Sequence, residues 1–195
     1  FTMPSAALKL SVTNALTLKK PSKNNPLPTI VLYVNDQAEI LGALGEAEYL
    51  SRAEALIDGA NFKGGLGEHV SDYALHVKDL PAITLIGVGK LDKLGANIAK
   101  VAANTYTAIK GAPKAALLWG DVICHKHFTQ FVLALQAASY RFDHHKSSSA
   151  DADALKEVIL VNNRDELAAY ETALSFAIAT DKGISAARDV ANEAP

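Results

Sequence analysis

Short runs of almost unbroken apolar residues, separated by helical patterns, constrain this chain more than any other feature of its sequence. Residues 29–34, 82–88 and 115–119 are such runs, and runs of this kind are typical of strands that are covered on both faces. Between and after them, apolar residues recur every three or four positions, as they do on one face of a helix. The alternation predicts an α/β fold: a three-layer α/β/α sandwich with a mixed, mainly parallel sheet.

The expected order of elements is β, β, α, β, β, α, β, α, β, α. Further strands are expected at residues 7–12, 72–77 and 158–161. Helices are expected from residue 36 to about 57 with breaks near Gly42 and Gly45, at 91–109, at 128–142, and from about 163 onward. Asn35 and Asp36 are suited to cap the first helix, and Asn163 with Glu166 has the spacing of a capping box for the last. The pattern leaves open an antiparallel pairing of the first two strands.

Length and composition agree with a folded globular chain. The 195 residues suit one large domain, or one domain with a short extension. Hydrophobic residues make up 49% and charged residues 21%, which excludes intrinsic disorder. The net charge of −2 gives no overall attraction to nucleic acid or to an anionic membrane, so neither is expected as a partner.

The expected compartment is the cytoplasm. The single cysteine, Cys124, excludes an intrachain disulfide and suggests a reducing environment. No apolar stretch approaches the roughly 18 residues of a transmembrane helix. The first residues also lack the basic start and apolar run of a secretory signal.

Two glycine motifs invite a comparison with ligand-binding loops. Gly87-Val88-Gly89-Lys90 follows a strand and precedes a helix. However, Asp92 stands where the dinucleotide fingerprint needs glycine, and the P-loop pattern is also not met. We expect a tight strand-to-helix turn there; the alternative is phosphate contact through exposed N–H groups. For residues 64–67, the alternatives are a flexible turn and a loop that approaches a ligand.

A histidine-rich region offers possible metal ligands. The donors are Asp121, Cys124, His125 and His127, and, further along, Asp143, His144 and His145. If one helix carries both groups, its rise of ~1.5 Å per residue separates them by about 25 Å. The spacings match no standard zinc pattern, so solvated histidines at helix ends are expected.

Nucleophilic catalysis finds equally little support in the sequence. Cys124 has only a sequence neighbour, His125, as a possible base, and sequence adjacency is not catalytic geometry. Asp151 and Asp153 lie in a serine-rich stretch and are expected to be solvated. The residues alone therefore predict no catalytic, cofactor-binding or metal-binding group.

Four stretches nevertheless resemble one family in order and spacing. Residues 59–68 resemble the Asp-Phe-Lys-Gly-Lys-x-Gly-Glu loop of leucyl (cytosol) aminopeptidases, and residues 82–90 resemble their strand ending in Gly-Leu-Gly-Lys. Residues 139–143 with Lys146 are similar to their Ser-Tyr-Arg-Phe-Asp-x-Tyr-Lys segment. Residues 187–195 resemble their Ala-Arg-Asp-Leu-Val-Asn-Glu-Pro-Ala-Asn junction, with Pro and Ala transposed.

The resemblance implies a particular domain organisation. Residues 1–163 would be the N-terminal α/β domain, similar in fold to macro domains, and residues 164–195 a long linker helix and the junction to a catalytic domain absent from this chain. In the family that later domain binds two divalent metals (zinc, manganese or magnesium). Its Asn-Thr-Asp-Ala-Glu-Gly-Arg-Leu signature does not occur here. The resemblance therefore implies no catalytic, cofactor or metal residue in this chain.

The implied role is that of a non-catalytic domain. The parent would be a homohexameric exopeptidase that removes N-terminal amino acids from peptides, and this domain would serve hexamer assembly and regulation. The alternative is a stand-alone macro-like module that binds ADP-ribose or a related nucleotide. DNA binding is a third possibility, which the net charge and only four arginines argue against.

Three expectations attach to the matched motifs. Phe142 lies on an apolar stripe and is expected in the core. Arg141 and Asp143 are expected to form ion pairs at the end of that helix. Arg188 and Asp189 are expected to hold the junction to the following domain.

Overall fold

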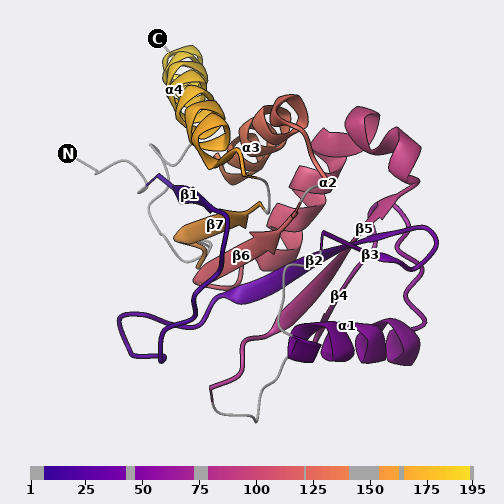
Figure 1. The fold of residues 1–195 in the computed structure, drawn as a ribbon. Helices are drawn as coiled ribbons and strands as arrows, with labels where there is room; N and C mark the ends of the chain where they lie inside the picture. Colours follow the sequence, from indigo (N-terminus) through magenta and orange to yellow (C-terminus); the bar gives the residue numbers. More distant parts are fainter. Residues whose placement is uncertain are drawn as a thin grey trace.

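The computed structural model describes residues 7–42, 47–72, 79–120, 122–140, 154–162 and 165–193 (Figure 1). Within these residues a seven-stranded sheet has the order β1-β7-β6-β2-β5-β4, and β3 pairs with β2 beside this path. The strands are β1 (Lys9–Thr13), β2 (Thr29–Asn35), β3 (Ile40–Leu41), β4 (His69–Asp72), β5 (Ile83–Gly89), β6 (Lys114–Leu118) and β7 (Glu157–Val161).

The sheet is mixed and mainly parallel, as predicted. β1, β7, β6, β2 and β5 pair in parallel, whereas β3 runs antiparallel to β2 and β4 antiparallel to β5. The first two strands do not pair with each other, because β1 lies at the far edge against β7. Alternate residues of and beside β1, Leu8, Leu10 and Val12, pack on the core between the sheet and three helices. β1 therefore adds its apolar residues to that core from the edge of the sheet beside β7.

Helices cover both faces and complete the predicted three layers. α1 (Ala47–Ala60) lies on one face, and α2 (Leu94–Ile109), α3 (His125–Ser139) and α4 (Leu167–Asn192) lie on the other (Figure 1). A short 3-10 helix, η1 (Leu91–Lys93), leads into α2. None of the helices in the described segments has the length and apolar character needed to cross a membrane.

β2 lies at the centre of the core and is buried from both sides. Val31 and Tyr33 point into the layer of α2 and α3, while Ile30 and Leu32 point toward α1. The Tyr33 ring stacks on Trp119 with ring centroids 3.5 Å apart. Burial raises the pKa of Tyr33, and its hydroxyl lies 3.3 Å from Thr105 Oγ1. The phenol is therefore held in its neutral form, which buries at lower cost than the phenolate.

The prediction that a helix starts at residue 36 is wrong. Residues 36–39 form a turn, and the chain then returns as β3 before α1 begins at Ala47. Asn35 Oδ1 accepts hydrogen bonds from the N–H groups of Gln37 and Glu39, both at 3.0 Å. Asn35 thus caps a turn instead of a helix, a use that its side chain permits equally well.

Other predicted boundaries shift or lie outside the described residues. A strand, β4, is found at His69–Asp72, where Ser71 pairs with Thr84 at 2.8 Å and Asp72 pairs with Arg52 at 2.9 Å. Of the strand expected at 72–77, residues 73–77 lie outside the described residues. These polar contacts are invisible to a hydrophobic pattern. α3 ends at Ser139, because Tyr140 is extended with φ −64 and ψ 130. Glu166 occupies the N-cap of α4 without a side-chain capping bond; its expected partner Asn163 and the Gly45 break fall outside the described residues.

α4 packs through its first half only. Tyr170, Leu174 and Ala177 are buried, and the Tyr170 hydroxyl donates to the Ile123 carbonyl at 2.7 Å. Further along, the predicted apolar stripe leaves the core, since Ile184 is 41% exposed. The second half of the helix extends away from the sheet (Figure 1).

Replacement of the stacked tryptophan tests the core. Trp119→Ala removes a fully buried ring that also meets Phe131 edge-on, so we expect a loss of about 3–5 kcal/mol in the free energy of unfolding. The control is Leu91→Ala, at a side chain that is 49% exposed, with an expected change within about 0.5 kcal/mol. Urea denaturation measures both, and equal losses would contradict the assignment of this core.

Candidate functional site

The carboxyl ends of the central parallel strands form the edge where open α/β sheets commonly hold ligands. β5, β2 and β6 end side by side there. α1 follows β2 on one face, and the helices after β5 and β6 lie on the other. Both glycine motifs of the sequence also lie at this edge.

The loop of residues 64–68 is docked on the end of β5. Gly89 N–H donates to the Gly64 carbonyl at 2.9 Å, and Gly87 N–H donates to the Glu68 carbonyl at 2.8 Å. Asn104 of α2 donates from Nδ2 to the same Glu68 carbonyl at 3.2 Å. The loop therefore extends the backbone pairing with β5 beyond the N-terminal end of β4.

Glycine is required where these backbones touch. A Cβ on Gly87 would lie 2.0 Å from the Gly65 carbonyl oxygen, and one on Gly64 would lie 2.0 Å from the Asn35 carbonyl oxygen. Gly64 and Gly89 also have positive φ angles of 69° and 71°, which glycine adopts without strain. These glycines let backbone approach backbone, which favours the tight-turn interpretation at residues 87–90.

The same contacts argue against the two ligand-binding alternatives. A phosphate loop needs backbone N–H groups directed at the ligand, but those of Gly87 and Gly89 donate within the chain. The N–H of Gly65 is held by Glu68 Oε2 at 3.1 Å. Residues 64–68 thus form a fixed backbone contact instead of a flexible turn.

A second close backbone contact lies on the other side of β2. A Cβ on Gly42 would lie 2.0 Å from the Trp119 carbonyl oxygen, and one on Gly120 would lie 2.6 Å from the Gly42 carbonyl oxygen. Both residues have positive φ. The crevice positions on either side of the β2 terminus are therefore occupied by the chain's own backbone.

Two other motifs meet at the end of α3. The Tyr140 hydroxyl donates to Asp189 Oδ1 at 2.6 Å, and Arg188 Cζ lies 5.3 Å from the centroid of the Tyr140 ring. Arg188 and Asp189 thus hold the second half of α4 to the end of α3 within this domain. The sequence-based expectation gave both residues a contact to a following domain and missed Tyr140 as their partner.

The histidines at the start of α3 have separate surroundings. His125 Nε2 lies 3.0 Å from Glu166 Oε2, and its ring meets Tyr170 edge-on. The His127 ring lies against Gly95 of α2, where an added Cβ would come within 2.6 Å of its Nε2 atom. Both are half-buried packing residues, which corrects the expectation of solvated histidines.

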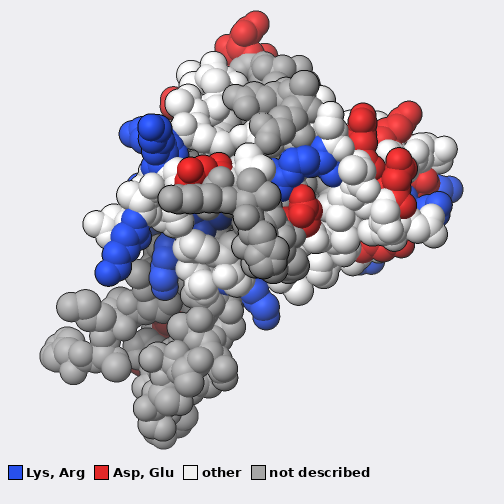
Figure 2. Space-filling model, turned by 90° about the horizontal axis from the view of Figure 1, so that it is seen from below, with Lys and Arg blue, Asp and Glu red and all other residues white. Residues whose placement is uncertain are grey.

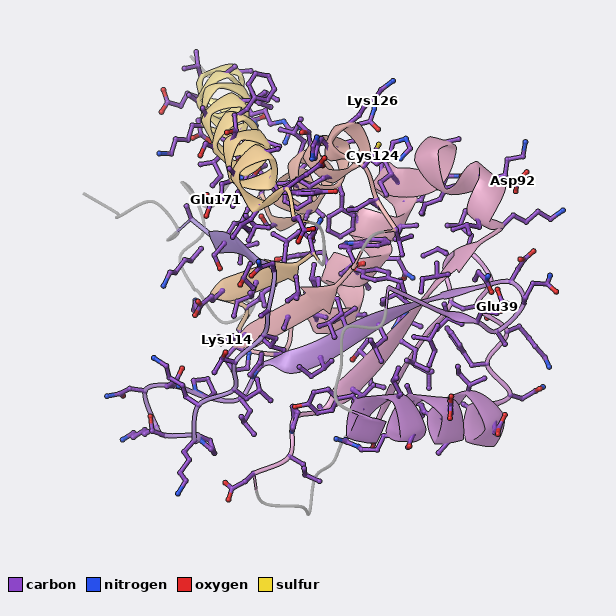
Figure 3. The ribbon with its side chains drawn as sticks, viewed as in Figure 1. Glu39, Asp92, Lys114, Cys124, Lys126 and Glu171 are labelled. Carbon is purple, nitrogen blue, oxygen red and sulfur yellow. The ribbon has the colours of Figure 1, made fainter. Side chains whose placement is uncertain are left out.

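The donors present do not fit a metal centre. Across the described segments, no group of three His, Cys, Asp or Glu side chains is placed to hold an ion. Cys124 is exposed, and Figure 3 shows Lys126 directed away from the sheet near it. The remaining residues singled out in the sequence lie outside the described residues: Asp121, Arg141, Phe142, Asp143, His144, His145, Lys146, Asp151 and Asp153.

Buried polar atoms at the ends of β6 and β7 were not anticipated. Trp119 Nε1 and both amide atoms of Asn162 are buried without a hydrogen-bond partner in the described part of the chain. They offer neutral hydrogen bonds only, with no nucleophile or ionisable group. Trp119 and Asn162 each follow an apolar strand directly. A hydropathy pattern does not distinguish such a position from the strand itself, so nothing in the sequence indicated these buried polar atoms.

The family model for the N-terminal domain of the cytosol aminopeptidase family matches residues 30–149. The chain belongs to this family. A probable cytosol aminopeptidase of Azotobacter vinelandii is 30% identical over 178 residues, which cover 81% of this chain and 36% of that protein. The cytosol aminopeptidase of Pseudomonas aeruginosa is 26% identical with the same coverage of both. The chain thus spans about a third of the length of these relatives.

Solved structures agree on the fold. A mutant of tomato leucine aminopeptidase superposes with a TM-score of 0.65 at 12% identity, covering 94% of this chain and 38% of that one. The bottromycin maturation enzyme BotP superposes with a TM-score of 0.56 at 18% identity, covering 86% of this chain and 33% of that one. At these identities the likeness shows the fold alone.

The family resemblance read from four motifs is confirmed, and the structure gives the motifs a physical meaning. The first two, at residues 59–68 and 82–90, form the glycine contact between the 64–68 loop and β5. Tyr140 and Asp189, from the other two, form the hydrogen bond between α3 and α4. In both pairs the described contacts are structural.

Matched glycine substitutions test the first contact. Gly87→Ala forces the docked loop to move, and we expect a loss of about 1–3 kcal/mol in the free energy of unfolding. Gly59 lies in α1 with open space around an added Cβ, so Gly59→Ala should be neutral or stabilise by up to about 1 kcal/mol. Chemical denaturation of the two variants checks the opposite signs.

The second contact is testable by titration of one tyrosine. The hydrogen bond to the Asp189 carboxylate is the main cause that raises the pKa of Tyr140. The stabilisation that the neutral phenol gives is fully present below its ordinary pKa near 10 and is lost as pH rises through the raised value. Asp189→Asn should lower the Tyr140 pKa toward the ordinary value, as measured by NMR of labelled tyrosine. An unchanged pKa in this variant would disprove the contact.

Proposed function

We propose that this chain is the non-catalytic N-terminal domain of a metal-dependent aminopeptidase that removes N-terminal amino acids from peptides. The observation that carries the proposal is the match to the family's N-terminal domain together with coverage of only 36% of the relatives' length. The rest of those relatives corresponds to a part that would carry the chemistry.

The proposed division of the chain is a domain at residues 1–163 and a linker helix with its junction at residues 164–195. The end of β7 at Val161 and the start of α4 at Leu167 support a boundary between them. The catalytic domain, with its two divalent metals (zinc, manganese or magnesium), would follow the helix. No residue of this chain is proposed to be catalytic or to bind a cofactor or metal.

The domain's own role would be to position the catalytic domain and to contribute to hexamer assembly and regulation, in the cytoplasm. Figure 2 shows acidic and basic side chains together on the face seen from below, and the net charge is −2. These features support protein partners over nucleic acid. No observation favours the alternative of a free-standing ADP-ribose module, and the N–H groups of Gly65, Gly87 and Gly89 donate within the chain.

Aminopeptidase assays test this proposal. The 195-residue chain should release no leucine from Leu-p-nitroanilide with manganese or zinc added, whereas the same chain with its natural C-terminal continuation should do so. Turnover by the pure 195-residue chain that a chelator abolishes would disprove the non-catalytic role. An inactive extended polypeptide, tested on several amino-acid p-nitroanilides, would disprove the aminopeptidase assignment.

A further inference from the structure

The outward side of α4 exposes large apolar side chains, which is unusual for a surface helix. Phe176 is 62% exposed and Val190 is 71% exposed. Ala179, Gly183 and Ala187 are exposed between them. Successive residues of a helix are rotated by about 100° around its axis, which places these five positions within about 60° of Phe176 around the helix. Along the axis they span about 21 Å. We call them the outer stripe.

The charges of α4 are excluded from this side. Its 26 residues contain five charged side chains: Glu171, Asp181, Lys182, Arg188 and Asp189. Viewed down the helix axis, all five lie on the side opposite Phe176, within about 60° of the point directly across from it. A surface helix normally places its charges away from the face that packs on the protein. In the second half of α4, the charged side carries Arg188 and Asp189, which contact Tyr140 of the domain, and the opposite side is free of charge.

Polar contacts fix which side of the helix faces outward. Arg188 and Asp189 both contact Tyr140 at the end of α3. The side of the helix that carries Arg188 and Asp189 is thus held against the end of α3, and the side of Val190 faces outward. Isolated exposed apolar residues are common, but a charge-free stripe on an oriented helix is typical of an interface.

We propose that the outer stripe is the docking surface for the polypeptide that follows α4, so that the helix is packed between the two domains. This rests on the proposed function, because the occupant is the part of the relatives that this chain does not cover. The family model identifies the matched part as N-terminal, so that part would follow the helix. The stripe reaches Val190, within one turn of the helix end at Asn192. A domain tethered there meets the stripe at high effective concentration, which favours it over a second copy of the chain.

Thiol labelling tests the stripe without disturbing its packing. Val190→Cys is placed in a Cys124→Ser background, because Cys124 is itself exposed. The matched control is Lys182→Cys, an exposed position on the charged side of the same helix. Maleimide reaction rates are compared between the 195-residue chain and the chain with its natural C-terminal continuation. Docking should slow labelling at position 190 by about tenfold or more in the longer protein, because reaction then needs local opening. The rate at position 182 should stay the same.

Each result decides the proposal. Equal rates at position 190 in the two proteins overturn it. Protection in the 195-residue chain alone that grows with its concentration also overturns it, because a second copy then covers the stripe. Aminopeptidase activity of the longer protein is measured in parallel. Protection at position 190 without aminopeptidase activity would support the docking surface and disprove the proposed function. Activity without protection would support the proposed function and disprove the docking surface.

Discussion

The structure depends on one strand that is buried on every side. β2 has parallel neighbours on both edges and apolar side chains in both cores, so its carboxyl end could reach water only at the edge of the sheet. There Gly64 lies against the Asn35 carbonyl at the end of β2, and Gly42 packs against Gly120 beside it. Because these contacts are made by backbone atoms, only glycine allows them. Among the described residues, the edge where many α/β folds bind ligands is thus used for backbone contacts within the domain.

This use of glycine explains why the glycine motifs are ambiguous in the sequence. Gly-Val-Gly-Lys after a strand is compatible with a phosphate loop and with a tight turn, since both need backbone that another group can approach closely. The deciding information is the partner of each N–H group. The N–H of Gly89 donates to the carbonyl of Gly64, and the N–H of Gly87 donates to the carbonyl of Glu68. Both partners are distant in the sequence. Local spacing does not contain that information, and the fold supplies it.

The layers of the fold were more predictable than their edges. The apolar runs of β2, β5 and β6 and the apolar stripes of α2 and α3 are visible in the sequence, because burial of apolar side chains alone determines these patterns. The misplaced helix start at residue 36 depends on one polar side chain, Asn35, which accepts the hydrogen bonds of a turn. β4 is likewise held by polar contacts, those of Ser71 and Asp72. The family was recognisable from four short motifs. The contact of Tyr140 with Asp189 was not, because nothing in either stretch identifies the other as its partner.

α4 shows where hydrophobic patterns reach their limit for a physical reason. An apolar stripe predicts a buried face without specifying what buries it. The first half of α4 follows that rule within the domain, with Tyr170, Leu174 and Ala177 in the core. In the second half, Tyr140 contacts Arg188 and Asp189 on the charged side. Val190 faces outward on the opposite side, in line with the exposed Phe176 of the first half. A helix with apolar residues on two sides is suited to two partners. The first is this α/β domain, and the second is the one that the outer stripe predicts.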